Sequence, residues 1–312
     1  MEYLTLKGTD LKVSRLCLGG CPMGGYGWGD VQDEELIKTI HAALDAGITM
    51  FDNADSYGLG HSEEILGKGL GKRRNNVVIA TKFGVRVENG KTFYDNSPEY
   101  IRTACENSLK RLGTDYIDLY QVHYRDGKTP IAEVVNALDE LKAEGKIRYY
   151  GLSNIHAEDA EEYKSLVGTF ACVQNEYSLA CRKFEEDLTT MCDELRLTPL
   201  TWGSLGQGIL TGKYTKNNMN FGSDDRRSRS IYVNFHGDKI EKNLEIVKAM
   251  RPVAKNHDVS VTAVAVRFIL DFIPNSVVLV GAKRPDQILG STEAMGWNLT
   301  EEELKILDDI SR

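Results

Sequence analysis

Short runs of apolar residues alternate with amphipathic segments along almost the whole chain. The apolar runs are nearly continuous, which is typical of buried parallel strands. We expect strands at residues 15–19, 48–52, 77–82, 117–123, 147–153, 171–176, 197–202 and 276–281. Helical spacing with start and stop signals predicts helices at 33–47, 97–113, 130–146, 156–168, 185–196 and 299–310. Eight strands with helices between them predict an α/β fold, a closed (β/α)8 TIM barrel formed by one domain over residues 1–312.

Two segments depart from this rhythm. Residues 3–14 alternate around a Gly-Thr-Asp turn, which predicts a β-hairpin that plugs the N-terminal end of the barrel. Residues 203–237, after the seventh strand, are glycine-rich and polar. A loop of that length in a compact domain tends to be functional.

The composition limits the possible partners. The chain has 312 residues, of which 41% are hydrophobic and 27% charged, as in globular proteins with a sizeable core. A net charge of −8 disfavours binding to phosphate backbones, so we expect no nucleic-acid partner. The most apolar stretch, 259–270, is too short to span a membrane and contains Arg267. The chain starts without a signal-peptide pattern, and the expected location is cytoplasmic.

The cysteines give no sign of a redox or metal role. The six residues form no C-x-x-C pair and no metal-like cluster with histidine. We therefore expect free thiols in a reducing compartment and no metal site.

Four ionisable residues follow three consecutive strands. Asp52 ends the second strand and is followed closely by Tyr57. Lys82 ends the third strand and His123 the fourth. Active sites of such barrels lie at the C-terminal ends of the strands, so the four side chains are expected to converge. Each alone is more often a cap, a packing residue or a surface charge, as Asp55 in the same turn is interpreted to be a cap, but together they favour catalysis.

The chemistry of these four residues fits the reduction of a carbonyl group. A free tyrosine, with a pKa of about 10, is a poor proton donor at neutral pH. A lysine ammonium beside it lowers that pKa, and an aspartate paired with the lysine fixes the ammonium. A neutral histidine can orient the carbonyl by hydrogen bonding. Side chains cannot supply a hydride, whereas a nicotinamide cofactor can.

Seven motifs resemble, in order and spacing, those of the aldo-keto reductase superfamily. They are FDNADSYG, ATKFG, YQVH, GLSN, QNEYS, LTGKY and VGAKRPDQ, and they cover essentially the whole chain. The chain is most similar to the bacterial branch that also resembles potassium-channel β subunits. The resemblance implies an NADPH-dependent oxidoreductase of small carbonyl compounds. Tyr57 would be the general acid/base, tuned by Lys82 and Asp52, and His123 would orient the carbonyl.

The resemblance also implies where the nicotinamide is held. Ser153, Asn154 and Gln174 match the residues that bind its carboxamide. Tyr177 matches the aromatic residue that stacks on its ring. Trp28 and Tyr124 would contribute to the substrate wall.

The phosphates would be held by the segment 203–237 and by the motif after the eighth strand. In that segment the implied contacts are Ser204, Leu205, Gly206, Lys213 and Arg227. Lys283 and Arg284 lie where a 2′-phosphate is bound, which favours NADPH over NADH. The remaining implied cofactor contacts are Gly20, Cys21, Trp202, Gly203, Gly208, Gly281, Ala282, Gln287 and Ser291.

Some positions depart from the family pattern, and some questions stay open. The family's Glu-Asn pair for the adenine is replaced by Gly290 and Ser291, which predicts a weaker grip. Arg125 is either a selector of anionic substrates or a solvated surface residue. Two other functions compete, a Schiff-base aldolase that uses Lys82 and a regulatory subunit that senses the cofactor. A homo-oligomer is possible.

Overall fold

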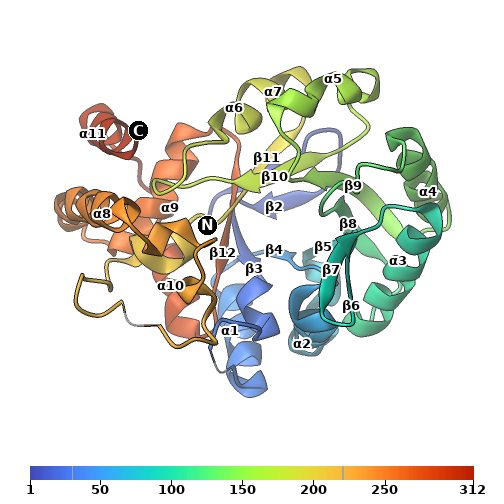
Figure 1. Cartoon of the computed structure of the whole chain (residues 1–312), viewed down its shortest axis with the longest axis horizontal. Helices are drawn as coiled ribbons and strands as arrows, with labels where there is room; N and C mark the ends of the chain where they lie inside the picture. Colours follow the sequence, from blue (N-terminus) through green and yellow to red (C-terminus); the bar gives the residue numbers. More distant parts are fainter. Residues whose placement is uncertain (30, 220) are drawn as a thin grey trace.

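Eight parallel strands close into a barrel in the computed structural model, which describes residues 1–29, 31–219 and 221–312. The strand order around the barrel is β10-β11-β12-β3-β4-β5-β8-β9, and the helices surround it (Figure 1). The strands are β3 (Leu16–Gly19), β4 (Met50–Asp52), β5 (Val78–Phe83), β8 (Ile117–Val122), β9 (Ile147–Ser153), β10 (Cys172–Glu176), β11 (Thr198–Trp202) and β12 (Val277–Gly281). The predicted barrel and its eight strands are confirmed.

The predicted N-terminal hairpin is also confirmed. β1 (Tyr3–Thr5) pairs antiparallel with β2 (Lys12–Ser14). Leu6, Leu11 and Val13 pack in one buried cluster with interior strand residues such as Met50 and Leu200. The hairpin therefore closes the N-terminal end of the barrel with apolar side chains.

Most predicted helices are present, with different lengths at two places. The helices are α1 (Asp33–Asp45), α2 (His61–Leu70), α3 (Pro98–Leu112), α4 (Ile131–Ala143), α5 (Ala160–Tyr163), α6 (Glu185–Leu188), α7 (Thr190–Glu194), α8 (Asp238–Asn256), α9 (Val261–Phe272), α10 (Pro285–Thr292) and α11 (Glu301–Ser311). The expected helix at 156–168 is reduced to α5 and adjoining 3-10 turns. The one expected at 185–196 breaks at Thr189, whose hydroxyl bonds the Glu185 carbonyl at 3.0 Å. No helix of the described residues is long and apolar enough to cross a membrane.

Several elements were not predicted from the sequence. α8, α9 and α10 belong to this group, as does a hairpin of β6 (Val85–Glu88) and β7 (Lys91–Tyr94) after β5. On α9, Arg267 is 1% exposed and pairs with Glu2 at 2.8 Å and Asp271 at 2.6 Å. The segment 203–237 is called the strap from here on, and its residue 220 lies outside the described residues. Residues 203–219 and 221–237 form a loop with short 3-10 turns at Gly206–Thr211, Arg226–Ser228 and Val233–Phe235.

Candidate active site

Asp52 and Lys82 form a buried ion pair at the C-terminal ends of β4 and β5. Lys82 is fully buried and Asp52 is 3% exposed. The ammonium also donates to the carbonyl oxygen of Asn53 at 2.8 Å. A buried charge is tolerated only when it is paired and hydrogen-bonded, and both conditions hold for this lysine.

The second carboxylate oxygen of Asp52 accepts hydrogen bonds from two side-chain amides. Gln121 donates at 3.0 Å and Gln174 at 2.8 Å. Gln121 was not predicted from the sequence. The signal that could have found it is the two-residue alternation in YQVH, which places it on the same face as His123. It also lies opposite Lys82 in the register of β5 and β8.

Tyr57 and His123 lie beside this ion pair. Their rings meet edge to face, with centroids 5.9 Å apart and planes at 85°. The Lys82 Nζ atom lies 5.3 Å from the centroid of the Tyr57 ring. The structure therefore brings all four predicted catalytic side chains into one cluster.

Burial decides the protonation of the two rings. It raises the pKa of the Tyr57 hydroxyl well above its usual value, and Cys21 and Asp52 add to the rise. The direction is opposite to the lowering expected from Lys82, because burial is the largest effect on this hydroxyl. Burial also lowers the pKa of His123 well below its usual range, with help from the charge of Lys82. At neutral pH the pair is thus a protonated phenol and a neutral imidazole.

The residues predicted to hold the carboxamide lie next to this cluster. Ser153 and Gln174 face each other in the register of β9 and β10, and the Ser153 hydroxyl donates to the Gln174 carbonyl at 2.9 Å. The amide of Asn154 donates to the His123 carbonyl oxygen at 3.0 Å. This places a row of polar groups along the C-terminal edge of β8, β9 and β10.

Tyr177 does not lie with this row. Its side chain is fully buried, and its hydroxyl donates to Glu185 of α6 at 2.8 Å. Gln174 and Glu176 share the interior face of the strand, because successive side chains point to opposite faces. Tyr177, the third residue after Gln174, therefore points to the helices. Trp202, which lies opposite Glu176 in the register, is the aromatic residue at the mouth, and its Nε1 atom is buried without a partner in the described part of the chain.

Four cations gather where the strap meets the start of α10. Burial lowers the pKa of Lys213, and the positive charges of Arg227, Arg284 and Lys283 lower it further. Arg227 pairs with Asp225, and Arg284 pairs with Asp286 at 3.0 Å. Cations that repel one another at a loop edge fit a ligand with several negative charges.

The other predicted cofactor contacts lie around the same rim, with one exception. Gly20 and Cys21 follow β3, and Trp202 ends β11. The strap opens with Gly203, Ser204, Leu205, Gly206 and Gly208. Gly281 ends β12, and Ala282 and Gln287 follow it. Ser291 is 1% exposed, and its hydroxyl bonds the Gln287 carbonyl of its own helix at 3.2 Å. Its hydroxyl is therefore already used inside α10.

Aromatic side chains form the wall above His123. Tyr124 stacks on His123 and on Tyr94 of β7, each with centroids 5.1 Å apart. Trp28 meets Tyr232 of the strap edge to face at 6.1 Å. The predicted wall residues Trp28 and Tyr124 are joined by two rings that were not predicted, because loop conformations decide them.

Arg125 matches neither of the two roles that the sequence left open, a selector of anionic substrates or a solvated surface residue. Its guanidinium donates to Glu162 at 3.1 Å, to the Tyr163 hydroxyl at 3.0 Å and to the Thr129 carbonyl at 2.8 Å. It joins the loop after β8 to α5, and both of its Nη atoms are used in these contacts.

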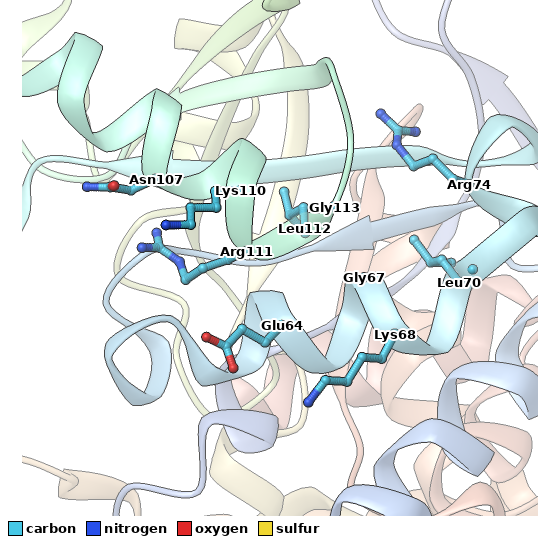
Figure 2. Close-up of a pocket in the computed structure, with 11 residues that line it drawn as sticks. Glu64, Gly67, Lys68, Leu70, Arg74, Asn107, Lys110, Arg111, Leu112 and Gly113 are labelled. Carbon is cyan, nitrogen blue, oxygen red and sulfur yellow. The ribbon is translucent and has the colours of Figure 1, made fainter.

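A groove of about 780 Å³ lies away from this cluster, between α2 and α3 (Figure 2). Its lining is charged, with Glu64 and Lys68 from α2 and Lys110 and Arg111 from α3. Arg111 is bound to the buried Glu63 at 2.7 Å. None of the predicted site residues lines this groove, so it is not the candidate active site.

The similarity to known proteins covers the whole chain. The aldo-keto reductase YhdN of Bacillus subtilis (strain 168) is 38% identical over 313 residues, which cover 99% of this chain and 93% of the relative. The NADH-specific methylglyoxal reductase of Escherichia coli (strain K12) is 32% identical over 327 residues, covering 100% of this chain and 98% of the relative.

Solved structures give the same result. The glycerol dehydrogenase AKR11B4 from Gluconobacter oxydans matches with a TM-score of 0.89 at 37% identity, over 99% of this chain and 94% of that one. An aldo-keto reductase from Klebsiella pneumoniae in complex with NADPH matches with a TM-score of 0.76 at 27% identity, over 100% and 96%. The model of the aldo/keto reductase family matches residues 15–312. The chain belongs to the aldo/keto reductase family.

Proposed function

We propose that this protein is an NADPH-dependent oxidoreductase that reduces aldehydes and ketones to alcohols and catalyses the reverse oxidation. The observation that carries the proposal is the buried Asp52–Lys82 pair beside a protonated Tyr57 and a neutral His123. Membership of the family and the similarity to a methylglyoxal reductase and a glycerol dehydrogenase support this reaction class.

Tyr57 is the proton donor in this proposal. Its raised pKa keeps the phenol protonated at neutral pH but also makes it a weak acid, so the phenolate that forms must be stabilised. The Lys82 ammonium, 5.3 Å from the ring centroid, stabilises the phenolate that remains after proton transfer. Neutral His123 donates a ring N–H to the carbonyl oxygen and so orients it toward Tyr57. When bound, NADPH supplies the hydride that is added to the carbonyl carbon.

The residues present fit this cofactor at both ends. Ser153, Asn154 and Gln174 offer hydroxyl and amide groups for the carboxamide, and the unpartnered indole of Trp202 is the candidate for stacking on the nicotinamide ring in place of Tyr177.

At the other end, Lys213, Arg227, Lys283 and Arg284 form the phosphate site in this proposal. NADH lacks the 2′-phosphate, so the preference for NADPH depends on Lys283 and Arg284 at the start of α10. One relative is described as NADH-specific and one solved neighbour contains NADPH, so the preference is a property to be measured for this chain.

The structure argues against the competing functions. A Schiff base needs an accessible, neutral amine, whereas Lys82 is fully buried and ion-paired. All four side chains of the catalytic cluster are in place, which favours turnover over a purely cofactor-sensing subunit and is compatible with a regulatory role at slow turnover.

The test is direct. The purified protein is incubated with NADPH or NADH and a panel of aldehydes and ketones, and the loss of cofactor absorbance is followed. Oxidation of NADPH by at least one carbonyl compound is expected. Failure to bind either nucleotide, measured by quenching of tryptophan fluorescence, would contradict the proposal.

A further inference from the structure

Two adjacent arginines of the strap have different surroundings. Arg227 pairs with Asp225 and lies over the Phe221 ring at 4.5 Å, within the phosphate cluster. Arg226 instead lies over the rings of Tyr26 at 5.0 Å and Trp28 at 5.9 Å, in the loop after β3. Only one of the two charges is therefore directed at the phosphate cluster.

Arg226 is fixed at the mouth of the barrel. Its backbone N–H donates to the Gly27 carbonyl at 2.9 Å, and its Nη1 atom donates to the Tyr232 hydroxyl at 3.4 Å. The Gly27 Cα is so close that a Cβ there would lie 2.3 Å from the Arg226 side chain, which only glycine permits. The guanidinium thus lies over two aromatic rings and donates to the hydroxyl of a third aromatic residue.

The charge of Arg226 reaches the catalytic cluster. Burial raises the pKa values of Tyr57 and Cys21, and the positive charge of Arg226 opposes the rise at both residues. The loop that carries Cys21 also packs on the turn of Tyr57, because a Cβ on Gly24 would lie 2.5 Å from the Gly58 nitrogen. The loop after β3 therefore connects Arg226 to the turn that carries the proposed proton donor.

This cation lacks an acidic counterpart in the described part of the chain. Arg226 forms no ion pair there, in contrast to Arg227, and its Nε atom is buried without a hydrogen-bond partner. A half-buried cation without an anion is unfavourable, and a ligand anion would remove the penalty. The planar guanidinium is suited to a carboxylate, which it can bind through two parallel hydrogen bonds.

We propose that Arg226 binds a carboxylate carried by the carbonyl substrate, so that the preferred substrates are aldehydes or ketones with an acid group. The proposal rests on the proposed function and names the substrate class of that same site. Arg125, the candidate from the sequence, is less suited because its two Nη atoms already donate to Glu162, Tyr163 and Thr129. The other source of an anion is the cofactor diphosphate, which the experiment separates.

The probes are 2-, 3- and 4-carboxybenzaldehyde, each compared with its methyl ester, with NADPH as reductant. The three isomers place the carboxylate at different distances from the carbonyl, and the ester keeps the shape without the charge. For at least one isomer, we expect kcat/KM to favour the acid over the ester. In Arg226→Gln this ratio should fall by about 10- to 100-fold, mainly through KM, as the loss of a charged hydrogen bond predicts.

Arg229→Gln is the matched control. Arg229 lies on the same strap and contacts the Tyr26 hydroxyl at 3.4 Å, but it is exposed. Its loss should leave the acid/ester ratio unchanged. Arg226→Lys keeps the charge without the planar guanidinium and should give an intermediate acid/ester ratio. It is the test variant if Arg226→Gln does not fold.

Three outcomes would overturn the proposal. One is a wild-type protein that reduces the esters as well as every acid. Another is an acid/ester ratio that survives Arg226→Gln or Arg226→Lys. The third is a loss that falls equally on acids and esters with a raised Kd for NADPH, which would assign Arg226 to the cofactor. Reduction of neither acids nor esters, nor of any other carbonyl compound, would contradict the proposed function itself.

Discussion

Asp55, which lies two residues before the proposed proton donor Tyr57, accepts a hydrogen bond from the Tyr100 hydroxyl at 3.2 Å. Its other oxygen, Oδ1, is buried without a partner in the described residues, so Asp55 is not the helix cap expected from the sequence. Burial raises the pKa of this carboxyl to about 7, Glu63 adds to the rise, and the bond from Tyr100 opposes it.

This raised pKa predicts how stability depends on pH. The carboxyl keeps its proton up to about pH 7 in the folded protein, but loses it near pH 4 when unfolded. Its contribution to stability is therefore present below pH 4, is lost as the pH rises through 7, and is then constant. The upper limit of the loss is about 4 kcal/mol.

Asp55→Asn should remove this dependence and should be more stable than the wild type at pH 8. Urea unfolding of both proteins at several pH values between 4 and 8 measures the effect. Tyr100→Phe, which removes the bond that lowers the Asp55 pKa, should move the decline to higher pH. An Asp55→Asn variant that keeps the wild-type slope would contradict the assignment.

Tyr57→Phe should lower kcat by at least about 10²- to 10⁴-fold, because a phenyl ring cannot protonate the carbonyl oxygen. NADPH binding should change little, since the ring and its neighbours are retained. The expected result is a strong loss of carbonyl reduction with an unchanged Kd for NADPH from fluorescence titration. Tyr116→Phe, at a tyrosine of the outer wall whose hydroxyl bonds Asn75 at 3.5 Å, serves as the control and should keep full activity.

Lys82→Met should destabilise the fold by about 3–5 kcal/mol, because it leaves the Asp52 carboxylate buried without its counter-ion. The double variant with Asp52→Asn should recover part of that loss, as a double-mutant cycle in urea would show. Lys305→Met breaks the exposed pair with Asp309 at 2.6 Å and should leave the stability nearly unchanged, because water screens that pair. Additive losses at positions 52 and 82 would mean that the two charges do not depend on each other.

Lys283→Ala and Arg284→Ala should each raise the Kd for NADPH by about 10-fold and leave the Kd for NADH nearly unchanged, because only NADPH carries the 2′-phosphate. Titrations with both nucleotides, at one fixed ionic strength, measure the difference. Arg73→Ala, on the outer wall where Arg73 pairs with Asp45 at 2.9 Å, is a control for net charge. Equal losses for NADPH and NADH would place these residues elsewhere on the cofactor.

The barrel could be predicted because strands buried on both faces leave a continuous apolar signal. The four residues at the ends of β4, β5 and β8 could be predicted because the carboxyl ends of parallel strands meet. α9 was missed because its residues 263–270 are buried on all sides, so no polar face marks the helical period.

Side-chain direction was harder to predict than position. Tyr177 follows the right strand but faces the helices, and Gln121 faces the interior between two hydrophobic neighbours. The high pKa of Tyr57 also depends on burial that only the packed loops create. Loop conformation likewise decides that Arg125 binds α5 and that Arg226 lies over Tyr26 and Trp28.

The ion pair between Arg267 and Glu2 attaches the N-terminal residues to α9. One cation buried in a late helix depends on the second residue of the chain, and Glu2 also binds Arg15 at 3.2 Å, next to the first barrel strand. Fraying at the N-terminus would therefore remove one of the two carboxylates that compensate this buried charge, the other being that of Asp271. For this reason the first and last parts of the sequence should melt together, and an affinity tag is better placed after Arg312 than before Met1.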